Sequence, residues 1–520
     1  MQSQLASDGY QQGQPPVNWY AGPFGGINLT SGKAALNQGT EGTEFSYLNN
    51  FDLYQQGSLV GASGNVQLNT GVSDNTAIIG IGAWMSPAGN YCIYAKASGK
   101  YYTMPIGGGA ETLISSGRSG TAVPTFVNFQ GAILVFNGVD SPWQYNGTVS
   151  TLTNQPTAWA TNVPYDADVL GSYVFACSKD GVFWCDSGNA NDWVDSANAG
   201  SFTNQFTDAT YPVALQNFGN SITLYTSGNR CYSISGTNYS NFTVVRYNGN
   251  RTVLSKLGTT VLNRAEYFFS GEAILPLEIN QYGTTLMSPE ADISYKIKAA
   301  LTTIGNRPVD LLLDQTQLSK AILLTNYYRN YIVLYFMSNG STVYDSALVY
   351  SMDLKAWTLR QLQPVTFAAQ VNNLVYTGTA SGQILQEFVG TTRADGINIQ
   401  ASFKTAWLDF NRPDLYKNIG ILHINATYTT TTNFTINIYA DYNESISFTR
   451  TLNNTNTYVP ASYGYGSYGV ASYGTYTIDF AQLQLNLQAR AIKIEFISND
   501  TSSDLEIYGI GIRALMGASS

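Results

Sequence analysis

The sequence is poor in histidine, cysteine and charge, and each shortage removes a class of function. His423 is the only histidine among 520 residues, so zinc motifs that need a histidine pair, such as HExxH, are absent. A Ser-His-Asp triad on His423 would need a nucleophile elbow, and no GxSxG occurs. We therefore expect a structural histidine, no enzymatic activity, and no catalytic, cofactor-binding or metal-binding residues.

The four cysteines are Cys92, Cys177, Cys185 and Cys231, and none shows CxxC spacing, which disfavours zinc or thioredoxin chemistry. If Asp180-Gly181 is a two-residue hairpin turn, Cys177 lies opposite Trp184 and Cys185 opposite Ala176. The two thiols then point to opposite faces of the hairpin. We predict free, mostly buried cysteines.

Charged residues make up only 11% of the chain, and the net charge is −9. An acidic chain without clustered Lys and Arg does not suit tight binding of phosphate. Met1 to Pro16 lacks both a basic start and an apolar core, so we expect no secretory signal, no membrane anchor, and synthesis in a cytoplasm. The nearly uncharged stretch from Gly120 to Val139 contains Pro124 and polar residues, and indicates two strands rather than a membrane span.

Aromatic residues reach 13%, and 49 glycines interrupt the hydrophobic runs, a mix typical of proteins with many short strands. Between about 75 and 390 one local unit returns: a hydrophobic strand, a short Gly/Asn/Asp turn and a second aromatic strand. Its clearest copies are 77–81 with 91–94, 132–138 with 143–147, 173–176 with 182–184, 222–225 with 230–234, 331–336 with 347–350, and 374–376 with 383–385, and another falls near 267–271. A period of roughly 40 to 50 residues in an all-β context predicts propeller blades.

One helix is predicted after residue 287. Ser288 can cap it, Pro289 suits its first position, and an apolar face follows before Gly305. That face consists of Ile293, Ile297, Ala300, Leu301 and Ile304. We expect it to serve packing rather than chemistry.

From about residue 400 the strands lengthen and alternate cleanly, as at 434–440, 483–487 and 492–496. Such alternation predicts half-buried antiparallel strands and a β-sandwich ending near Arg513. The fold prediction is thus all-β: a β-propeller with a β-sandwich-like platform domain and one short helix. The predicted divisions are 1–70 (N-terminal extension and platform-associated strands), 71–395 (a propeller of about six or seven blades) and 396–520 (the platform), with a Tyr/Gly/Ser loop at 461–476.

Paired carboxylates could still support glycosidase chemistry, which needs only two acids about 5 to 10 Å apart. The densest group is Asp186, Asp192 and Asp195. Its segment lacks the central Gly and final Glu of an EF-hand loop, so a turn that connects two blades is favoured over calcium binding. Gly107-Gly108-Gly109 lacks the Lys-Ser/Thr of a phosphate loop and is interpreted as a turn.

Four segments carry a family resemblance. NFQGAILVFNG at 128–138, followed by WQYNG at 143–147, resembles a strand pair of phage tail nozzle proteins, also called tail hub, tail tubular protein B or packaged-DNA stabilisation proteins. FWCDSGNANDW at 183–193 is similar to that family's aromatic-Ser-Gly-Asn turn, LNNFDL at 48–53 to its opening, and WLDFNRPDLYK at 407–417 to the entry of its terminal sandwich. The family often carries an Arg-Pro-Gly turn after the opening, where this chain has Val60-Gly61-Ala62-Ser63-Gly64.

The resemblance implies a virion protein of a short-tailed phage tail that forms a homohexameric ring below the head-to-tail adaptor. Fibres or spikes would attach outside, and double-stranded DNA would pass through the lumen without specific binding. An acidic or uncharged wall suits such a conduit, since a basic wall would hold the polymer. The alternatives are a receptor-binding fibre or other virion β-protein, and a β-propeller carbohydrate-active protein.

Overall fold

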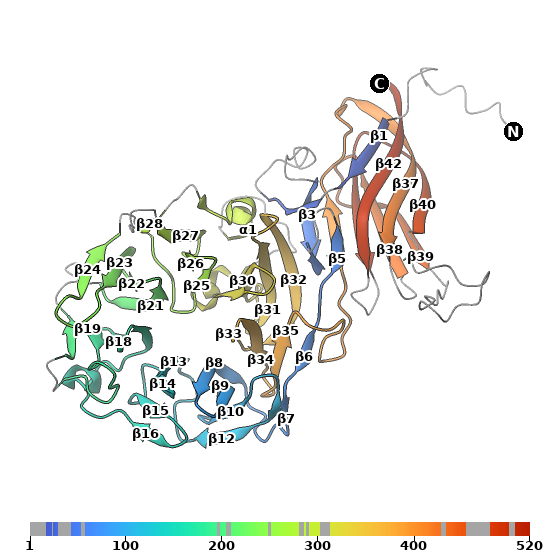
Figure 1. Cartoon of the computed structure of the whole chain (residues 1–520). Coiled ribbons are helices and arrows are strands. Elements are labelled where there is room, and N and C mark those ends of the chain that lie inside the picture. Colours follow the sequence, from blue (N-terminus) through green and yellow to red (C-terminus); the bar gives the residue numbers. More distant parts are fainter. Residues whose placement is uncertain are drawn as a thin grey trace, which may run out of the picture.

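The computed structural model describes residues 17–22, 24–29, 43–53, 58–194, 198–203, 210–247, 251–279, 285–287, 291–301, 313–427, 433–453, 479–498 and 505–519. Within these ranges the chain forms a ring of seven four-stranded units joined to a two-sheet sandwich (Figure 1). The predicted fold class, a β-propeller with a β-sandwich, is confirmed. No helix in these ranges is long and apolar enough to cross a membrane.

The seven blades are antiparallel units whose strands follow one another along the chain, except that the last blade takes its fourth strand from the N-terminal region. Blades 1 to 3 consist of β8 (Ile78–Ser86), β9 (Gly89–Lys96), β10 (Tyr101–Pro105) and β12 (Thr112–Ser115); β13 (Thr125–Phe129), β14 (Ala132–Phe136), β15 (Trp143–Tyr145) and β16 (Val149–Thr151); and β17 (Asp166–Leu170), β18 (Tyr173–Ser178), β19 (Gly181–Trp184) and β20 (Gly200–Phe202). Blades 4 and 5 consist of β21 (Pro212–Phe218), β22 (Ser221–Thr226), β23 (Arg230–Ser235) and β24 (Thr243–Arg246); and β25 (Thr259–Leu262), β26 (Ala265–Phe269), β27 (Ile274–Ile279) and β28 (Thr285–Met287). Blades 6 and 7 consist of β29 (Ile322–Asn326), β30 (Tyr331–Phe336), β31 (Tyr344–Ser351) and β32 (Ala356–Val365); and β33 (Phe367–Val371), β34 (Leu374–Gly378), β35 (Ile384–Glu387) and β6 (Asn65–Gln67).

The first strand of each blade contacts the first strand of the next, and β33 of blade 7 contacts β8 of blade 1, so the inner wall is a closed ring. The hydrophobic pairs predicted from sequence lie in these blades. In blade 1 the predicted pair is the first and second strands, whereas in blades 2, 3, 4, 6 and 7 it is the second and third. These central strands carry continuous apolar runs because both of their faces pack against neighbouring blades.

Strand β6 closes the ring. It pairs antiparallel with β35, with Val66 opposite Gln386, although it lies within the segment 1–70 that the sequence assigned to an N-terminal extension. Beyond it, Asn69 donates to the carbonyl of Gly382 (2.9 Å) and accepts from the amide of Ile384 (2.7 Å). Gly64 approaches Thr392 so closely that a Cβ atom would lie 1.8 Å from its carbonyl oxygen. A side chain at position 64 would therefore displace the closing strand.

We predict that Asn69→Ala weakens the closure. Asn69 is 1% exposed, and its loss leaves a buried carbonyl and a buried amide without partners, at a cost of about 2–4 kcal/mol. Thermal unfolding should show a clear fall in melting temperature. Gln67→Ala, an exposed position in β6, is the matched control and should change little. Equal effects of the two substitutions would contradict this role for Asn69.

The sandwich is built from both ends of the chain. One sheet contains β1 (Val17–Ala21), β4 (Phe51–Asp52), β5 (Leu59–Gly61), β42 (Glu506–Ser519), β37 (Leu415–Thr427) and β40 (Asp479–Ala489). The other contains β2 (Phe24–Ile27), β3 (Thr43–Asn49), β36 (Ser402–Thr405), β41 (Ile492–Ser498), β38 (Asn433–Ala440) and β39 (Ile446–Asn453). Strand β42 extends to Ser519, so the expectation that the sandwich ends near Arg513 is wrong by several residues.

The second sandwich sheet continues into blade 6. Strand β3 pairs with β36 on one side and meets β32 in parallel on the other, at Asn49 and Leu359. The result is a single ten-stranded sheet that runs from β29 in the propeller to β39 in the sandwich. One apolar cluster follows the same path and includes Leu323 and Trp357 of blade 6 and Phe496 of the sandwich.

The predicted helix is described only in its central part. It consists of a 3-10 turn, Tyr295–Ile297, continued by α1 (Lys298–Leu301). The predicted start at Ser288 and Pro289 lies outside the described residues; further on, the Asp292 carboxylate accepts from the amide and hydroxyl of Ser294 in the turn that precedes Tyr295. Ile297, Ala300 and Leu301 pack into the shared apolar cluster, as the apolar face indicated.

All four cysteines are free and buried, as predicted. The predicted hairpin register is wrong: Cys177 lies opposite Val182 and Phe175 opposite Trp184, with Lys179-Asp180 at the turn. A shift of two residues keeps every side chain on its face, so Cys177 and Cys185 still lie in different clusters. The Tyr/Gly/Ser loop at 461–476 lies outside the described residues.

Candidate functional site: the propeller channel

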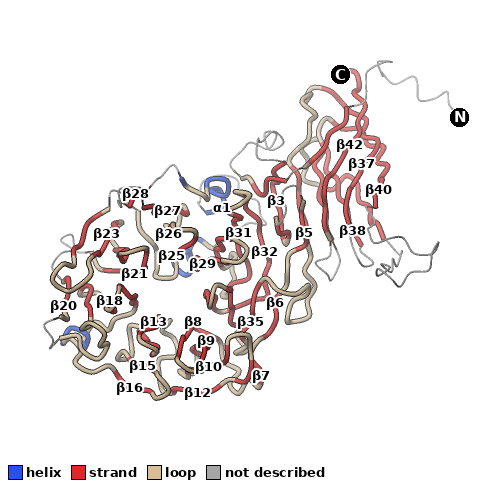
Figure 2. The backbone as a smooth tube through the Cα atoms, viewed as in Figure 1, coloured by secondary structure: helices blue, strands red, loops and turns tan. Residues whose placement is uncertain are grey.

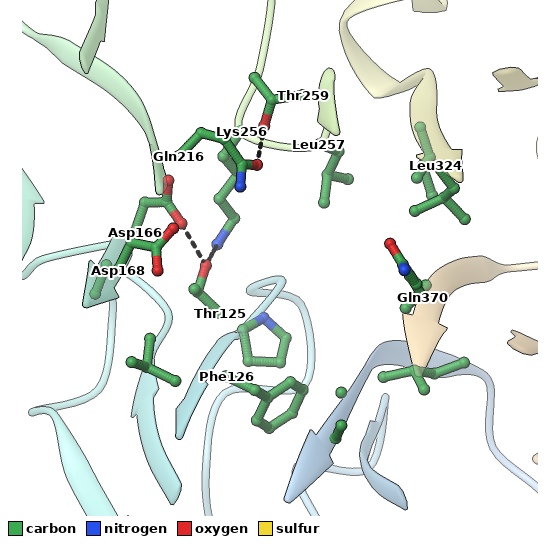
Figure 3. A pocket seen from close by; sticks show the side chains of 18 of the residues that line it. Thr125, Phe126, Asp166, Asp168, Gln216, Lys256, Leu257, Thr259, Leu324 and Gln370 are labelled. Carbon is green, nitrogen blue, oxygen red and sulfur yellow. Dashed lines mark hydrogen bonds between the residues drawn. The ribbon is translucent and has the colours of Figure 1, made fainter. Parts of the chain in front are cut away.

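The blades surround a central channel (Figure 2), which contains a cavity of about 510 Å³. Figure 3 shows side chains that line this cavity. Its wall is formed by the first strands of the blades, which contribute one to four residues each, and by Pro124, Lys256 and Leu257, which precede two of these strands. Only three of the lining residues are charged: Asp166, Asp168 and Lys256. A cavity of this size, half apolar and with a few convergent polar groups, has the properties of a small-molecule site.

Both aspartates lie on β17 and hold the neighbouring blade through its backbone. Asp166 accepts from the amide of Leu215 (2.8 Å), and Asp168 accepts from the amide of Asn217 (2.6 Å). Alternate residues of a strand point to the same side, so the pair Asp-x-Asp matches alternate amides of β21. The spacing explains why two carboxylates occur on this inner strand.

Other blade interfaces use neutral polar pairs. The Asn128 amide group of blade 2 binds backbone atoms of Ala83 and Met85 in blade 1 (2.6 and 2.7 Å). The hydroxyl of Thr259 donates to Gln216 (3.0 Å), and that of Thr325 donates to Gln370 (2.8 Å). These contacts fix the rotation of each blade relative to the next.

Lys256 reaches across the channel. It precedes blade 5, yet its ammonium group donates to the carbonyls of Val123 (2.7 Å) and Tyr165 (2.6 Å) and to the hydroxyl of Thr125 (3.0 Å). Thr125 in turn donates to Asp166 (2.8 Å), so one hydroxyl lies between the lysine and the carboxylate (Figure 3). Burial lowers the pKa of Lys256, and the negative charge of Asp166 opposes that shift. The side chain ties blade 5 to blades 2 and 3 at the end of the channel where the inner strands begin.

We predict that Lys256→Met lowers stability. The substitution keeps the length of the side chain but leaves two carbonyls and Asp166 without their cationic partner, at a cost of about 1–3 kcal/mol. Differential scanning calorimetry should show a lower melting temperature. Lys320→Met, at an exposed position, is the control, and a melting temperature unchanged in both variants would rule out a bracing role for Lys256.

Glu266 is a buried carboxyl group between blades 4 and 5. Its side chain is fully buried and accepts from the hydroxyls of Thr223 (2.6 Å) and Tyr225 (2.7 Å). Burial raises the pKa of Glu266 to about 8, while the two hydroxyl donors act in the opposite direction. The same cause raises the pKa of Asp168 to about 7. Burial thus makes the ionised form of both acids less favourable than it is in water.

The raised pKa of Glu266 makes the free energy of unfolding fall as pH rises. Between pH 4.5, the ordinary pKa of the side chain, and about 8, the folded protein holds the Glu266 proton that the unfolded chain has lost. Each unit of difference between the pKa values of Glu266 in the folded and unfolded states changes the free energy of unfolding by about 1.4 kcal/mol.

We predict that Glu266→Gln removes this pH dependence. The melting temperature of the variant, relative to the native protein, should increase from pH 5 to pH 8. Glu272→Gln, with an exposed side chain, should follow the native curve. A constant difference between variant and native protein across this range would contradict the raised pKa.

A second polar network joins propeller and sandwich. Asn50 accepts from the amide of Gln361 in β32 (2.9 Å) and donates to the carbonyl of Gln400 (2.9 Å). Arg329, in the turn after β29, pairs with Asp52 of β4 (2.9 Å). Asn50 and Asp52 belong to the LNNFDL segment, so that segment forms the joint between the two units.

The other residues that the sequence analysis singled out do not line the cavity. Asp186 and Asp192 lie in a turn between β19 and β20 of blade 3, so the predicted connection between two blades is wrong, and Asp195 lies outside the described residues. Within the described ranges, no group of three His, Cys, Asp or Glu side chains could hold a metal ion. His423 is a partly exposed residue of β37 opposite Gly511 of β42. Gly107 and Gly108 lie in a turn that ends at the short strand Gly109–Ala110.

Sequence reasoning missed the cavity residues. Asp166, Asp168 and Lys256 are single charges in a weakly charged chain, separated by up to 90 positions. The Asp-x-Asp pattern at 166–168 was the one available signal.

No protein-family model and no curated protein matches the chain. Solved structures with a similar fold include BamB from Moraxella catarrhalis (12% identity, 63% of this chain and 90% of that chain, TM-score 0.37). YCF48 bound to D1 peptide is similar over 63% of this chain and 95% of that chain (10% identity, TM-score 0.40). BBS1N in complex with ARL6DN is similar over 63% and 97% (12% identity, TM-score 0.39). These structures are β-propeller proteins, the architecture that the strand pairings of this chain establish independently.

Proposed function

We propose that this chain is a structural subunit of the tail nozzle of a short-tailed phage. Six copies would form a ring below the head-to-tail adaptor, carry fibres or spikes outside, retain the packaged genome and conduct it on ejection. The observation that carries the proposal is the joint between propeller and sandwich. The nozzle-like segment LNNFDL supplies Asn50 and Asp52 to that joint, where they bind β32 and Arg329 of blade 6.

Two further nozzle-like segments have structural roles that support the proposal. Trp193 is 2% exposed and packs against Trp159, with ring centroids 4.8 Å apart, between blades 2 and 3. The segment 407–417 leads into β37. Its Lys417 is buried, and the ammonium group donates hydrogen bonds to the carbonyls of Arg412 and Arg490. These segments hold units together, which is the requirement of a particle that must resist internal pressure.

Mechanical continuity also favours a structural role. A ten-stranded sheet links the propeller to the sandwich, and strands that share hydrogen bonds and a core transmit force without a flexible linker. The propeller leaves few exposed strand edges, which limits unwanted pairing. A rigid two-part subunit can bind the adaptor with one part and form the tube with the other.

The first experiment is light scattering with negative-stain imaging of the purified protein, alone and mixed with the adaptor. A sixfold ring with a central hole, or a monomer that becomes one on the adaptor, supports the proposal. A trimer, or a monomer indifferent to the adaptor, would overturn it in favour of a receptor-binding or carbohydrate-active protein.

We predict that the outward face of the β1-β42-β37-β40 sheet takes part in assembly. Tyr20 (75% exposed), Leu515 and Ile421 lie there; Leu515 is paired with Asn418, and Ile421 is paired with Gln484 and Arg513. Aromatic and aliphatic residues with little charge are typical of the buried centre of an interface.

Ile421→Glu should therefore abolish ring formation or adaptor binding, measured by light scattering, while circular dichroism stays unchanged. Val139→Glu, at an exposed loop position of blade 2, is the control. Assembly of Ile421→Glu at native affinity would exclude this face from the interface.

A further inference from the structure

The propeller cavity contains one carboxylate that nothing in the described chain neutralises. Asp166 is offset by Lys256 through the hydroxyl of Thr125. Asp168 receives only two backbone amides, from Asn217 (2.6 Å) and Val169 (2.7 Å), and forms no ion pair with a described residue. A carboxylate withdrawn from water without a counter-ion raises the free energy of the folded state. The raised pKa of Asp168, caused first by burial, reflects that cost.

Asp168 is one of the residues that line the cavity. Asp168 is only partly buried, and Figure 3 shows its side chain on the same wall as Asp166, beside the cavity. Each of its oxygens accepts one amide, and a carboxylate oxygen can accept two hydrogen bonds. Asp168 therefore retains capacity for a donor that enters the cavity.

The other residues of the cavity wall indicate which kind of ligand could carry that donor. Ala83, Leu257, Leu324 and Ala369 present apolar surface from four different blades. The amide of Gln370 projects from blade 7, and its oxygen is occupied by Thr325 (Figure 3). Calcium sites usually combine several carboxylate and carbonyl oxygens, whereas the cavity offers one carboxylate without a cationic partner. An ammonium group on an apolar body matches both halves of the wall.

We propose that the propeller channel binds a small primary ammonium compound with a compact apolar body, its charged group on Asp168 and its body against the apolar wall. The cation supplies the missing counter-charge, and its N–H groups use the free lone pairs of the carboxylate. Charge-assisted hydrogen bonds of this kind are about twice as strong as neutral ones. The cavity, at about 510 Å³, accommodates a body the size of a six-membered ring. The site is independent of ring assembly, so it stands apart from the proposed nozzle function.

The test uses isothermal titration calorimetry on the full chain with n-butylammonium, cyclohexylammonium and 2-phenylethylammonium. Each probe is compared with its neutral alcohol. We expect saturable binding of at least one ammonium compound, one per chain, and at least tenfold weaker binding of the matching alcohol. Failure of all three ammonium probes, equal binding of the alcohols, or displacement of the probe by Ca²⁺ would overturn the proposal.

Two variants locate the site. Asp168→Asn should weaken binding of the cation at least tenfold and leave the alcohol unaffected. Because this substitution also places an amide group against backbone amides and can impair folding, Ala369→Leu provides a second route: it fills the cavity without changing charge and should abolish binding. Ala110→Leu, at an exposed position of the short strand Gly109–Ala110, should bind as the native protein does. Native affinity in a folded Ala369→Leu variant would place the ligand outside the channel.

Discussion

The whole architecture depends on the pairing of β6 with β35. This contact closes the ring, and it also brings Gly64 to Gly390, whose backbone atoms hydrogen-bond at 3.1 Å. The chain thus enters and leaves the propeller at one point. Because both ends emerge together beside blade 6, segments before residue 62 and after residue 398 can combine into one sandwich. The pairing of β1 with β42 and of β3 with β36 then joins the two ends of the chain within the sandwich.

In a closed ring of seven blades, each blade must also keep a fixed rotation relative to its neighbours. Polar contacts between the inner strands provide this constraint. Neutral pairs suffice at several interfaces, such as Asn128 with blade 1. At blades 3 and 4 the contacts are carboxylates on backbone amides. The cost of burying acids in the interior appears as raised pKa values for Asp166, Asp168 and Glu266, and the charge of Lys256 opposes this shift at Asp166. Burial of these acids lowers the free energy of unfolding, but their hydrogen bonds define how the blades are arranged.

The sequence predicted the parts whose local pattern is strong. Second and third strands of blades, such as β14 and β18, are apolar on both faces and were recognised, as were the alternating strands β38 and β41 of the sandwich. The innermost strand β17 was harder, since Asp166 and Asp168 interrupt its apolar pattern for reasons that exist only once β21 lies beside it. Strand β6 has three residues, Asn-Val-Gln, and no local property distinguishes it from a loop. The cavity was invisible for the same reason: its wall takes a few residues from every blade, and the role of Lys256 depends on carbonyls that lie 91 and 133 positions away.

The joint at Asn50 connects these observations with the proposed role. Asn50 has a φ of 54°, a left-handed conformation that asparagine tolerates better than most residues, and this turn lets one side chain bind both β32 and residue 400. A polar side chain buried at such a point is a poor source of stability but a strict geometric requirement, because any change of angle between propeller and sandwich breaks its hydrogen bonds. A free-standing two-domain protein has little need of that constraint. A subunit whose sandwich must meet one partner while its propeller lines a common tube depends on it, because an error in this angle is repeated in every copy of the ring.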